Sequence, residues 1–156
     1  MGNSRQTHRG SLMKLVKGIV LLCLVLTLQA CSKPDVTGSY VFTDPTTIDY
    51  ITLAQSPDGH VKGQQIFAST SWVDVSGFAQ QEWRLSGTIK DGVLNLTLTS
   101  PRSPESTPMV GTFDGRSLLL TTLRGYPMRY IAITPERYAV LRHALIAGQK
   151  LESTAR

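Results

Sequence analysis

Residues 83–99, with the sequence WRLSGTIKDGVLNLTLT, decide the fold class of this chain. Trp83, Leu85, Gly87 and Ile89 share one phase of a two-residue alternation, and a second alternating run follows the central Asp-Gly pair. This period is typical of an antiparallel strand with one buried face and one wet face. Asp-Gly between two such runs favours a type I′ turn, which needs positive φ at both central residues. The stretch therefore predicts a β-hairpin.

The same pattern continues on both sides of this hairpin. Further turn signals stand at residues 56–59 and at Asp114-Gly115. Together they predict strands over residues 39–43, 49–55, 60–68, 81–90, 93–99, 110–113, 117–123 and 128–134. Residues 101–108 contain three prolines, which do not fit a central strand, so a loop is expected there. Residues 69–80 fit either a strand or a loop around Trp72.

The last part of the chain changes to a helical pattern. Thr134 suits an N-cap, Pro135 the first helical position and Glu136 the first turn. Apolar residues then recur at helical spacing up to Gly148, a plausible stop. One C-terminal α-helix is therefore expected at about residues 135–147.

The fold class that follows is mostly β: a small antiparallel meander barrel of about eight strands with one C-terminal α-helix. Closure would remove the sheet edges that otherwise promote aggregation. A β-sandwich is the alternative. The domain is expected to span residues 38–156, and residues 31–37, which lack an apolar pattern, are interpreted as a tether.

The N-terminal region has the layout of an export signal. The apolar run from Gly18 to Leu28 has eleven residues and follows Lys14 and Lys17. A run of this length is too short to span a bilayer but fits a secretory signal peptide. Met13 opens a compact version of the same signal and is a second candidate for the translation start.

The end of this run, Leu28-Gln29-Ala30-Cys31, resembles the lipobox of bacterial lipoprotein precursors. The resemblance implies that residues 1–30 are a signal peptide removed just before Cys31, whose thiol receives a diacylglycerol. Leu28 and Ala30 would then be recognised by the signal peptidase, while Gln29 departs from the usual small residue. Cys31 would be the sole cysteine of the exported part, since Cys23 lies in the leader. A lone thiol has no disulfide partner, which also favours lipidation.

Several consequences for location follow from this resemblance. It implies a cell-envelope lipoprotein that is held on a membrane by its lipid, whose acyl chains would include palmitate. With Ser32 after the cysteine, the outer membrane facing the periplasm is favoured in a Gram-negative host. The net charge of +5 comes largely from the four basic residues of the leader. The remainder is nearly neutral and gives no argument for nucleic-acid binding.

A second resemblance concerns the start of the domain. Gly38-Ser39-Tyr40 resembles the glycine-x-aromatic opening of calycin barrels such as lipocalins, with Tyr where Trp is usual. It implies a barrel that carries a small apolar ligand, with Arg124 or Arg129 as a basic partner on a late strand. Large inward residues such as Trp83, Leu96 and Leu120 would instead fill the barrel, whereas a cavity of about 300 Å³ or more would favour a carrier.

Catalytic and metal-binding motifs are missing from the sequence. It contains no nucleophile elbow, phosphate-binding loop, HExxH or CxxC. His60 and His143 lack further ligands at suitable spacing, and Asp44 and Asp49 form a candidate carboxylate pair around a short segment. We therefore expect a non-enzymatic protein without metal or cofactor that binds an unknown envelope protein or other envelope component. A carrier of a small apolar ligand is the alternative.

Overall fold

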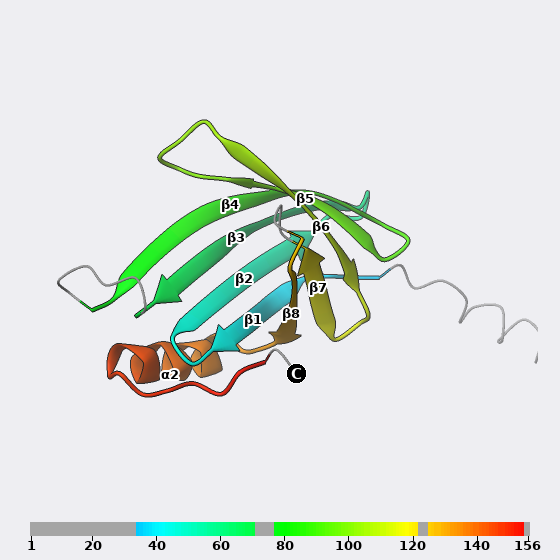
Figure 1. The fold of residues 1–156 in the computed structure, drawn as a ribbon. Helices are drawn as coiled ribbons and strands as arrows, with labels where there is room; N and C mark the ends of the chain where they lie inside the picture. The colour runs from blue at the N-terminus through cyan, green and yellow to red at the C-terminus, as the bar shows by residue number, and fades with distance from the viewer. Residues whose placement is uncertain (1–33, 71–76, 122–124, 155–156) are drawn as a thin grey trace, which may run out of the picture. The chain divides into compact units, whose positions relative to one another are not determined.

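The computed structural model describes residues 34–70, 77–121 and 125–154 of the chain. Within them, eight antiparallel strands form one closed barrel in sequence order, and one α-helix follows (Figure 1). The elements are β1 (Gly38–Asp44), β2 (Thr47–Gln55), β3 (His60–Ser69), β4 (Ala79–Lys90), β5 (Val93–Thr99), β6 (Ser106–Phe113), β7 (Ser117–Thr121), β8 (Pro127–Ala132) and α2 (Pro135–Ile146). The predicted meander barrel with a C-terminal helix is confirmed, and the β-sandwich alternative is wrong.

The hairpin that decided the fold class has the expected turn. Asp91 and Gly92 have φ values of 52° and 77°, both positive as the type I′ geometry requires. The pairing of β4 with β5 runs from Lys90↔Val93 to Arg84↔Thr99. The inward residues Leu85 on β4 and Leu96 on β5 are 2% exposed, whereas the outward residues of β4 from Gln80 to Lys90 are exposed. The predicted alternation of faces is therefore confirmed in this hairpin.

One loop prediction is wrong in part, because β6 begins at Ser106 and contains Pro108, paired with Thr97. The backbone N–H of Phe113 donates to the carbonyl of Gly92, on the side of β6 that faces β5. Because backbone N–H groups alternate in direction along a strand, those at even-numbered positions of β6 face β7. The β6–β7 pairing begins only at Val110. Pro108 has no N–H to donate toward β7, but at this position β6 has no partner strand on that side among the described residues. The proline therefore costs no ladder hydrogen bond there.

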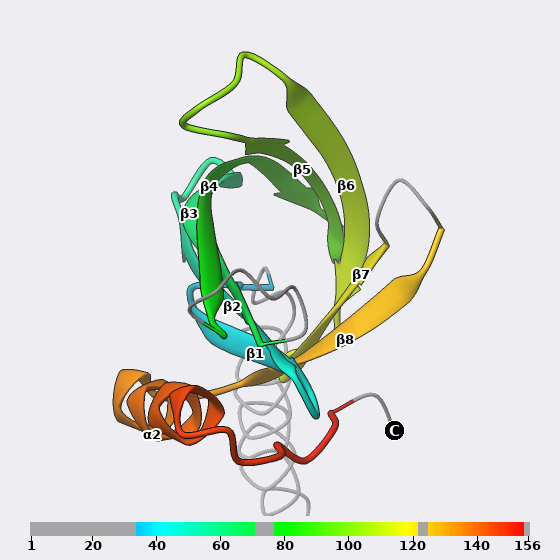
Figure 2. The same cartoon turned by 60° about the vertical axis from the view of Figure 1, so that its left-hand side comes forward.

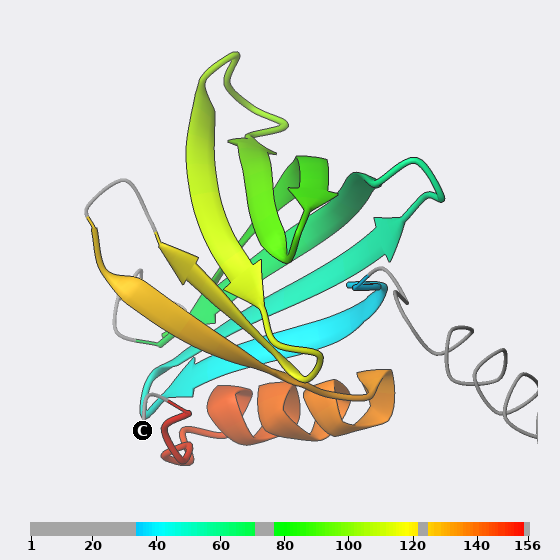
Figure 3. The same cartoon turned by 90° about the vertical axis from the view of Figure 1, so that its right-hand side faces the viewer.

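Two apolar clusters hold the fold together. The first fills the inside of the barrel and includes Leu94, Leu118 and Leu120, each 0% exposed. The second joins the outer face of β1–β3 to α2, which lies across the outside of the barrel (Figures 2 and 3). There Tyr50 stacks on Tyr138 with ring centroids 3.9 Å apart. The helix therefore covers strands that are apolar on both faces.

The chain closes the barrel between its first and last strands. β1 pairs with β8 at only two positions, Tyr40↔Ala132 and Val41↔Ile131. Beyond them, Thr43 accepts a hydrogen bond from the backbone N–H of Thr154 at 3.0 Å and donates its own N–H to the Thr154 hydroxyl. The segment after α2 thus continues the edge of β1 where β8 no longer pairs with it.

The residues just before β1 also belong to the domain. Val36 is 0% exposed within the interior cluster, and its backbone N–H donates to the Gln55 side chain at 3.0 Å. The Tyr40 hydroxyl donates to the Val36 carbonyl at 3.1 Å. The compact unit begins at Pro34, so part of the predicted tether 31–37 packs into the barrel.

Inward-facing glycines give the strands their curvature. A Cβ on Gly87 would overlap the carbonyl oxygen of Asn95 on β5, and one on Gly63 would overlap the carbonyl oxygen of Thr52 on β2. Glycine kinks of this kind let a sheet coil tightly enough to close. The barrel therefore requires a missing side chain at these positions.

We predict that Gly87→Ala destabilises the domain by about 1–3 kcal/mol, because the backbones of β4 and β5 must move apart to admit the methyl group. Urea unfolding followed by circular dichroism measures the loss. Ser86→Ala, a change at the neighbouring exposed position, is the control and should be nearly neutral. Equal stabilities of the two variants would contradict a close approach at Gly87.

Candidate functional site

The two ends of the barrel are built differently. One end, here named the turn end, carries the short β2–β3, β4–β5 and β6–β7 connections and the buried Val36. The opposite end, here named the loop end, carries the longer β3–β4, β5–β6 and β7–β8 connections together with the two-residue β1–β2 turn. Longer connections on a rigid scaffold are where binding residues concentrate. The loop end is therefore the better candidate for a binding site.

A polar cluster lies inside the barrel toward the loop end. It consists of Asp49 on β2, Gln65 on β3 and Tyr130 on β8, which are 2%, 5% and 0% exposed. The Tyr130 hydroxyl donates to Asp49 Oδ2 at 2.7 Å. Gln65 Nε2 donates to both carboxylate oxygens of Asp49, at 2.8 and 2.7 Å. We name these three residues the Asp49 cluster.

Burial dominates the electrostatics of this cluster. It raises the pKa of Asp49 from 3.8 to about 6, against the opposing effect of the hydrogen bonds from Tyr130 and Gln65. Burial, and secondarily the neighbouring carboxylate, raises the pKa of Tyr130 well above its usual value. Asp49 thus changes charge near neutral pH, while Tyr130 remains a hydrogen-bond donor.

One acceptor of the cluster is unused. Gln65 Oε1 is buried and has no hydrogen-bond partner among the described residues. A buried polar atom left unpaired costs about 1–3 kcal/mol, so native proteins rarely leave one without a reason. The atom offers a position where a bound donor would gain a full hydrogen bond.

A cavity of about 440 Å³ lies at the rim of the loop end. It exists because β4 runs past the end of β5, so within the described residues Ala79–Trp83 pair with β3 alone. We name it the rim cavity, and its lining residues are Gln80, Gln81, Glu82, Trp83, Ser100, Pro101 and Arg102. Amide, carboxylate, guanidinium and indole groups together suit a polar ligand that also presents a flat surface.

Trp83 connects the rim cavity to the Asp49 cluster. It is the register partner of Gln65 across the β3–β4 ladder, and both side chains have the inward phase of their strands. Its ring meets that of Phe67 edge to face, with centroids 6.4 Å apart. The indole is only half-buried, so the prediction of a core tryptophan holds for its direction but not for full burial.

The rim is also braced from outside the barrel. Glu82 accepts hydrogen bonds from Gln64 and Gln80, each at 3.1 Å. Arg142 on α2 donates to Gln80 Oε1 at 3.3 Å and lies 5.8 Å from the centre of the Phe78 ring. The outer helix therefore helps to hold the projecting part of β4.

The residues that the sequence analysis singled out do not come together at one site. Leu28, Ala30, Cys31, Met13 and Trp72 lie outside the described residues. The suggested carboxylate pair is not formed: Asp44 accepts a hydrogen bond from the backbone of Thr46 at an exposed turn, while Asp49 is buried inside the barrel. Of the three residues predicted to fill the barrel, Leu96 and Leu120 lie in the interior cluster, whereas Trp83 is only partly buried.

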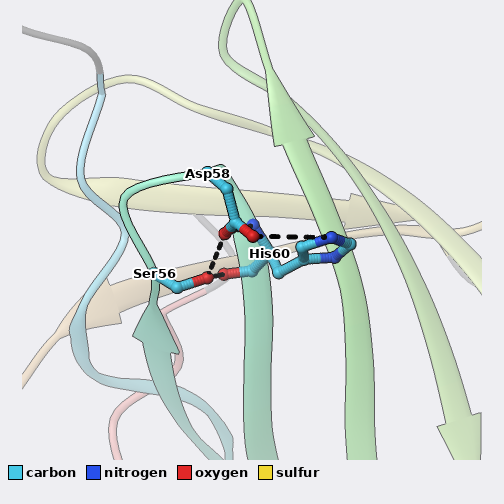
Figure 4. A network of polar contacts seen from close by, with 3 residues as sticks. All are labelled: Ser56, Asp58 and His60. Atoms are coloured by element: carbon cyan, nitrogen blue, oxygen red, sulfur yellow. Dashed lines mark hydrogen bonds and ion pairs between the residues drawn. The ribbon is translucent and has the colours of Figure 1, made fainter.

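His60 belongs to a polar network at the turn end, shown in Figure 4. The Ser56 hydroxyl donates to Asp58 Oδ1, and His60 Nε2 lies 3.8 Å from Asp58 Oδ2. The residue types resemble a hydrolase triad, but the serine bonds the carboxylate and not the imidazole. Asp58 and His60 are 66% and 65% exposed, so the network organises a turn.

The remaining candidates give no second site. His143 is exposed in the last turn of α2, and the described residues contain no group of three or more potential metal ligands. Arg129 is exposed and alternates with buried Tyr130, so it does not face Tyr40 inside the barrel. Arg124 lies outside the described residues.

Comparisons with protein-family models, curated proteins and solved structures give no match for this chain. Among the described residues, no helix has the length and apolar character needed to cross a membrane.

Sequence reasoning missed the Asp49 cluster. Its signal was a polar residue in the inward phase of an alternating strand: Asp49 shares its phase with Ile51 and Leu53, and Gln65 shares its phase with Val61. A polar side chain in that phase must find a partner inside the barrel. The phase could have identified the candidates, but not which of them meet.

We predict that the stability of the domain depends on pH through Asp49. The folded protein keeps the proton up to about pH 6, whereas the unfolded chain releases it near 3.8, so the folded state binds more protons between these values. The stability that protonation gives is complete below pH 4 and is lost as pH rises through 6. Relative to Asp49→Asn, the wild type should lose on the order of 2–3 kcal/mol between pH 4 and pH 7.

Urea unfolding at several pH values measures this difference. Asp44→Asn, which removes a partly exposed carboxylate outside the cluster, is the control and should retain the loss of stability that Asp49 causes. A wild-type profile parallel to that of Asp49→Asn would show that Asp49 has an ordinary pKa in the folded protein.

Proposed function

We propose that this protein is a lipid-anchored lipoprotein of a bacterial cell envelope and that the loop end of its barrel binds a polar envelope component without catalysing a reaction. The observation that carries the binding proposal is the polar rim cavity, whose Trp83 is the register partner of Gln65 in the Asp49 cluster. The lipobox resemblance of Leu28-Gln29-Ala30-Cys31 supports the anchor. The partner would be an envelope protein or another polar molecule of that compartment.

A lipid on Cys31 is sufficient to hold the domain on a membrane. Each buried methylene group contributes about 0.8 kcal/mol, and two or more long chains give stable attachment. The outer membrane facing the periplasm is the favoured location if the host is Gram-negative. Anchoring there would keep the loop end at high local concentration near other envelope components.

The polar character of the site supports a polar partner. The rim cavity offers a carboxylate, a guanidinium and two glutamine amides around one indole. Inside, Gln65 Oε1 can accept a hydrogen bond that nothing described in the domain supplies. An apolar ligand would remove water from these groups without offering them new hydrogen bonds, which costs free energy.

A small apolar ligand remains the second candidate because of a groove outside the barrel. It has a volume of about 420 Å³ and lies between α2, β8 and the segment after the helix. Ile131 and Val140 on its walls are 43% and 55% exposed. Since Leu96 and Leu120 fill the interior, an apolar ligand would use this groove and not the barrel core that the calycin resemblance implies.

The anchor predicts that Cys31→Ala abolishes incorporation of labelled palmitate in a bacterial host. Cys23→Ala, which changes the leader only, should leave labelling intact and serves as the control. Mass spectrometry of the mature N-terminus identifies the acylated residue. Labelling that survives Cys31→Ala would remove the lipoprotein proposal.

The binding proposal predicts partner contact at the loop end. With p-benzoylphenylalanine in place of Arg102, illumination of living cells should give a discrete adduct. The same photoreactive residue in place of Val110, which is 51% exposed on the outer wall, is the matched control. Proteomic and lipid mass spectrometry of the captured material identify the partner.

Two results would contradict a loop-end site in this experiment. One is a specific adduct at position 110 with none at position 102. The other is no adduct at position 102 while the wild-type protein still co-purifies with a partner from its native membrane.

A further inference from the structure

We propose that the turn end of the barrel rests against the lipid headgroups of the membrane that holds Cys31, so that the loop end points into the aqueous compartment. This inference rests on the proposed lipidation of Cys31. It adds which surface of the domain meets the bilayer and which surface remains available to a partner.

Val36 is held firmly at the turn end of the barrel. Its side chain is fully buried, and its backbone N–H and carbonyl bond to Gln55 and Tyr40. Gln55 ends β2 and Gly38 begins β1, so these contacts fix Val36 at the turn end. The chain therefore leaves the domain at this end from a rigid point.

The connection between Cys31 and the barrel is short. Only residues 32 and 33 separate Cys31 from Pro34, where the compact unit begins. Three Cα–Cα steps span at most about 11 Å. The ten residues of β3 have a length of roughly 33 Å, or about 25 Å along the axis of a barrel with tilted strands. The tether is therefore too short to let the loop end face the membrane.

The turn end carries charged side chains. Exposed Asp58, Asp91 and Asp114 stand at its three hairpin turns. Hydrogen bonds, chiefly from Ser117, lower the pKa of Asp114 to about 2, and those from Ser56 and the His60 backbone lower that of Asp58. These charges must remain hydrated, so the turn end can lie among headgroups but cannot enter the hydrocarbon.

The turns at this end form one connected platform. Ile89 donates its backbone N–H to Gly59, Phe113 donates to Gly92 and Ala132 donates to Arg116. Each bond joins a turn to a strand outside its own hairpin. A constraint applied through Val36 is therefore transmitted to the whole barrel and not to a single loop.

Depth-dependent fluorescence quenching tests this orientation. Asp91→Cys at the turn end and Pro104→Cys at the loop end each introduce one reactive thiol, because the proposed acylation occupies Cys31. The full lipidated proteins are labelled with a small fluorophore and reconstituted into vesicles of phosphatidylethanolamine and phosphatidylglycerol that carry headgroup spin labels. We expect several-fold stronger quenching at position 91 than at position 104. Equal quenching, or stronger quenching at position 104, would overturn the orientation.

A lengthened tether is the matched control. Twelve Gly/Ser residues inserted between Ser32 and Lys33 add a root-mean-square reach of about 20 Å, which should remove most of the difference between the two positions. An unchanged difference would show that the short connection does not set the orientation. Mass spectrometry of the protein separates the lipidation proposal from the orientation proposal. An unacylated protein that does not bind vesicles would contradict both. An acylated, vesicle-bound protein with equal quenching at the two positions would contradict only the orientation.

Discussion

Closure of the sheet between β1 and β8 is the constraint on which the structure depends. Only two residue pairs make this contact, yet without it both edge strands would be free and the interior cluster would face water. The segment around Thr154 extends the edge of β1 by bonding to Thr43. The residues after α2 are thus part of the closure, and the helix brings them there by packing on the outer face of β1–β3.

The Asp49 cluster places polar groups in a barrel interior that is otherwise packed with apolar side chains. A leucine in the same inward phase would fill the barrel without desolvating a carboxylate, and replacing buried charged groups by apolar ones often stabilises a protein. Asp49 instead has a pKa raised to about 6 and leaves Gln65 Oε1 unpaired. Departures of this kind concentrate at functional sites, where stability is exchanged for binding. This argument favours the loop end over the better-packed turn end as the place of function.

Local patterns in the sequence predicted most of the fold. The Asp91-Gly92 turn and the alternation around it determine a hairpin by short-range sterics, so no distant contact was needed to find it. Pro108 was misassigned because its tolerance depends on where β7 ends, which is a tertiary property. The site was less predictable, since Tyr130 and Asp49 are 81 residues apart in the chain and meet only when the barrel closes. Val36 was missed because a single buried residue has no period.

The difference between the two ends follows from how each is built. Tight turns need few residues and bond to neighbouring strands, so the turn end is compact and Val36 can fill it. At the loop end β4 projects beyond β5, which leaves the edge of Gln80–Trp83 beside the β5–β6 connection and forms the rim cavity. The proposed anchor at Cys31 adjoins the compact end, and the unpaired edge of β4 lies at the other end. With that anchor, the domain would receive a partner on the side opposite the membrane. With a long flexible tether, the difference between the two ends would not set the orientation of the domain, because either end could then face the membrane.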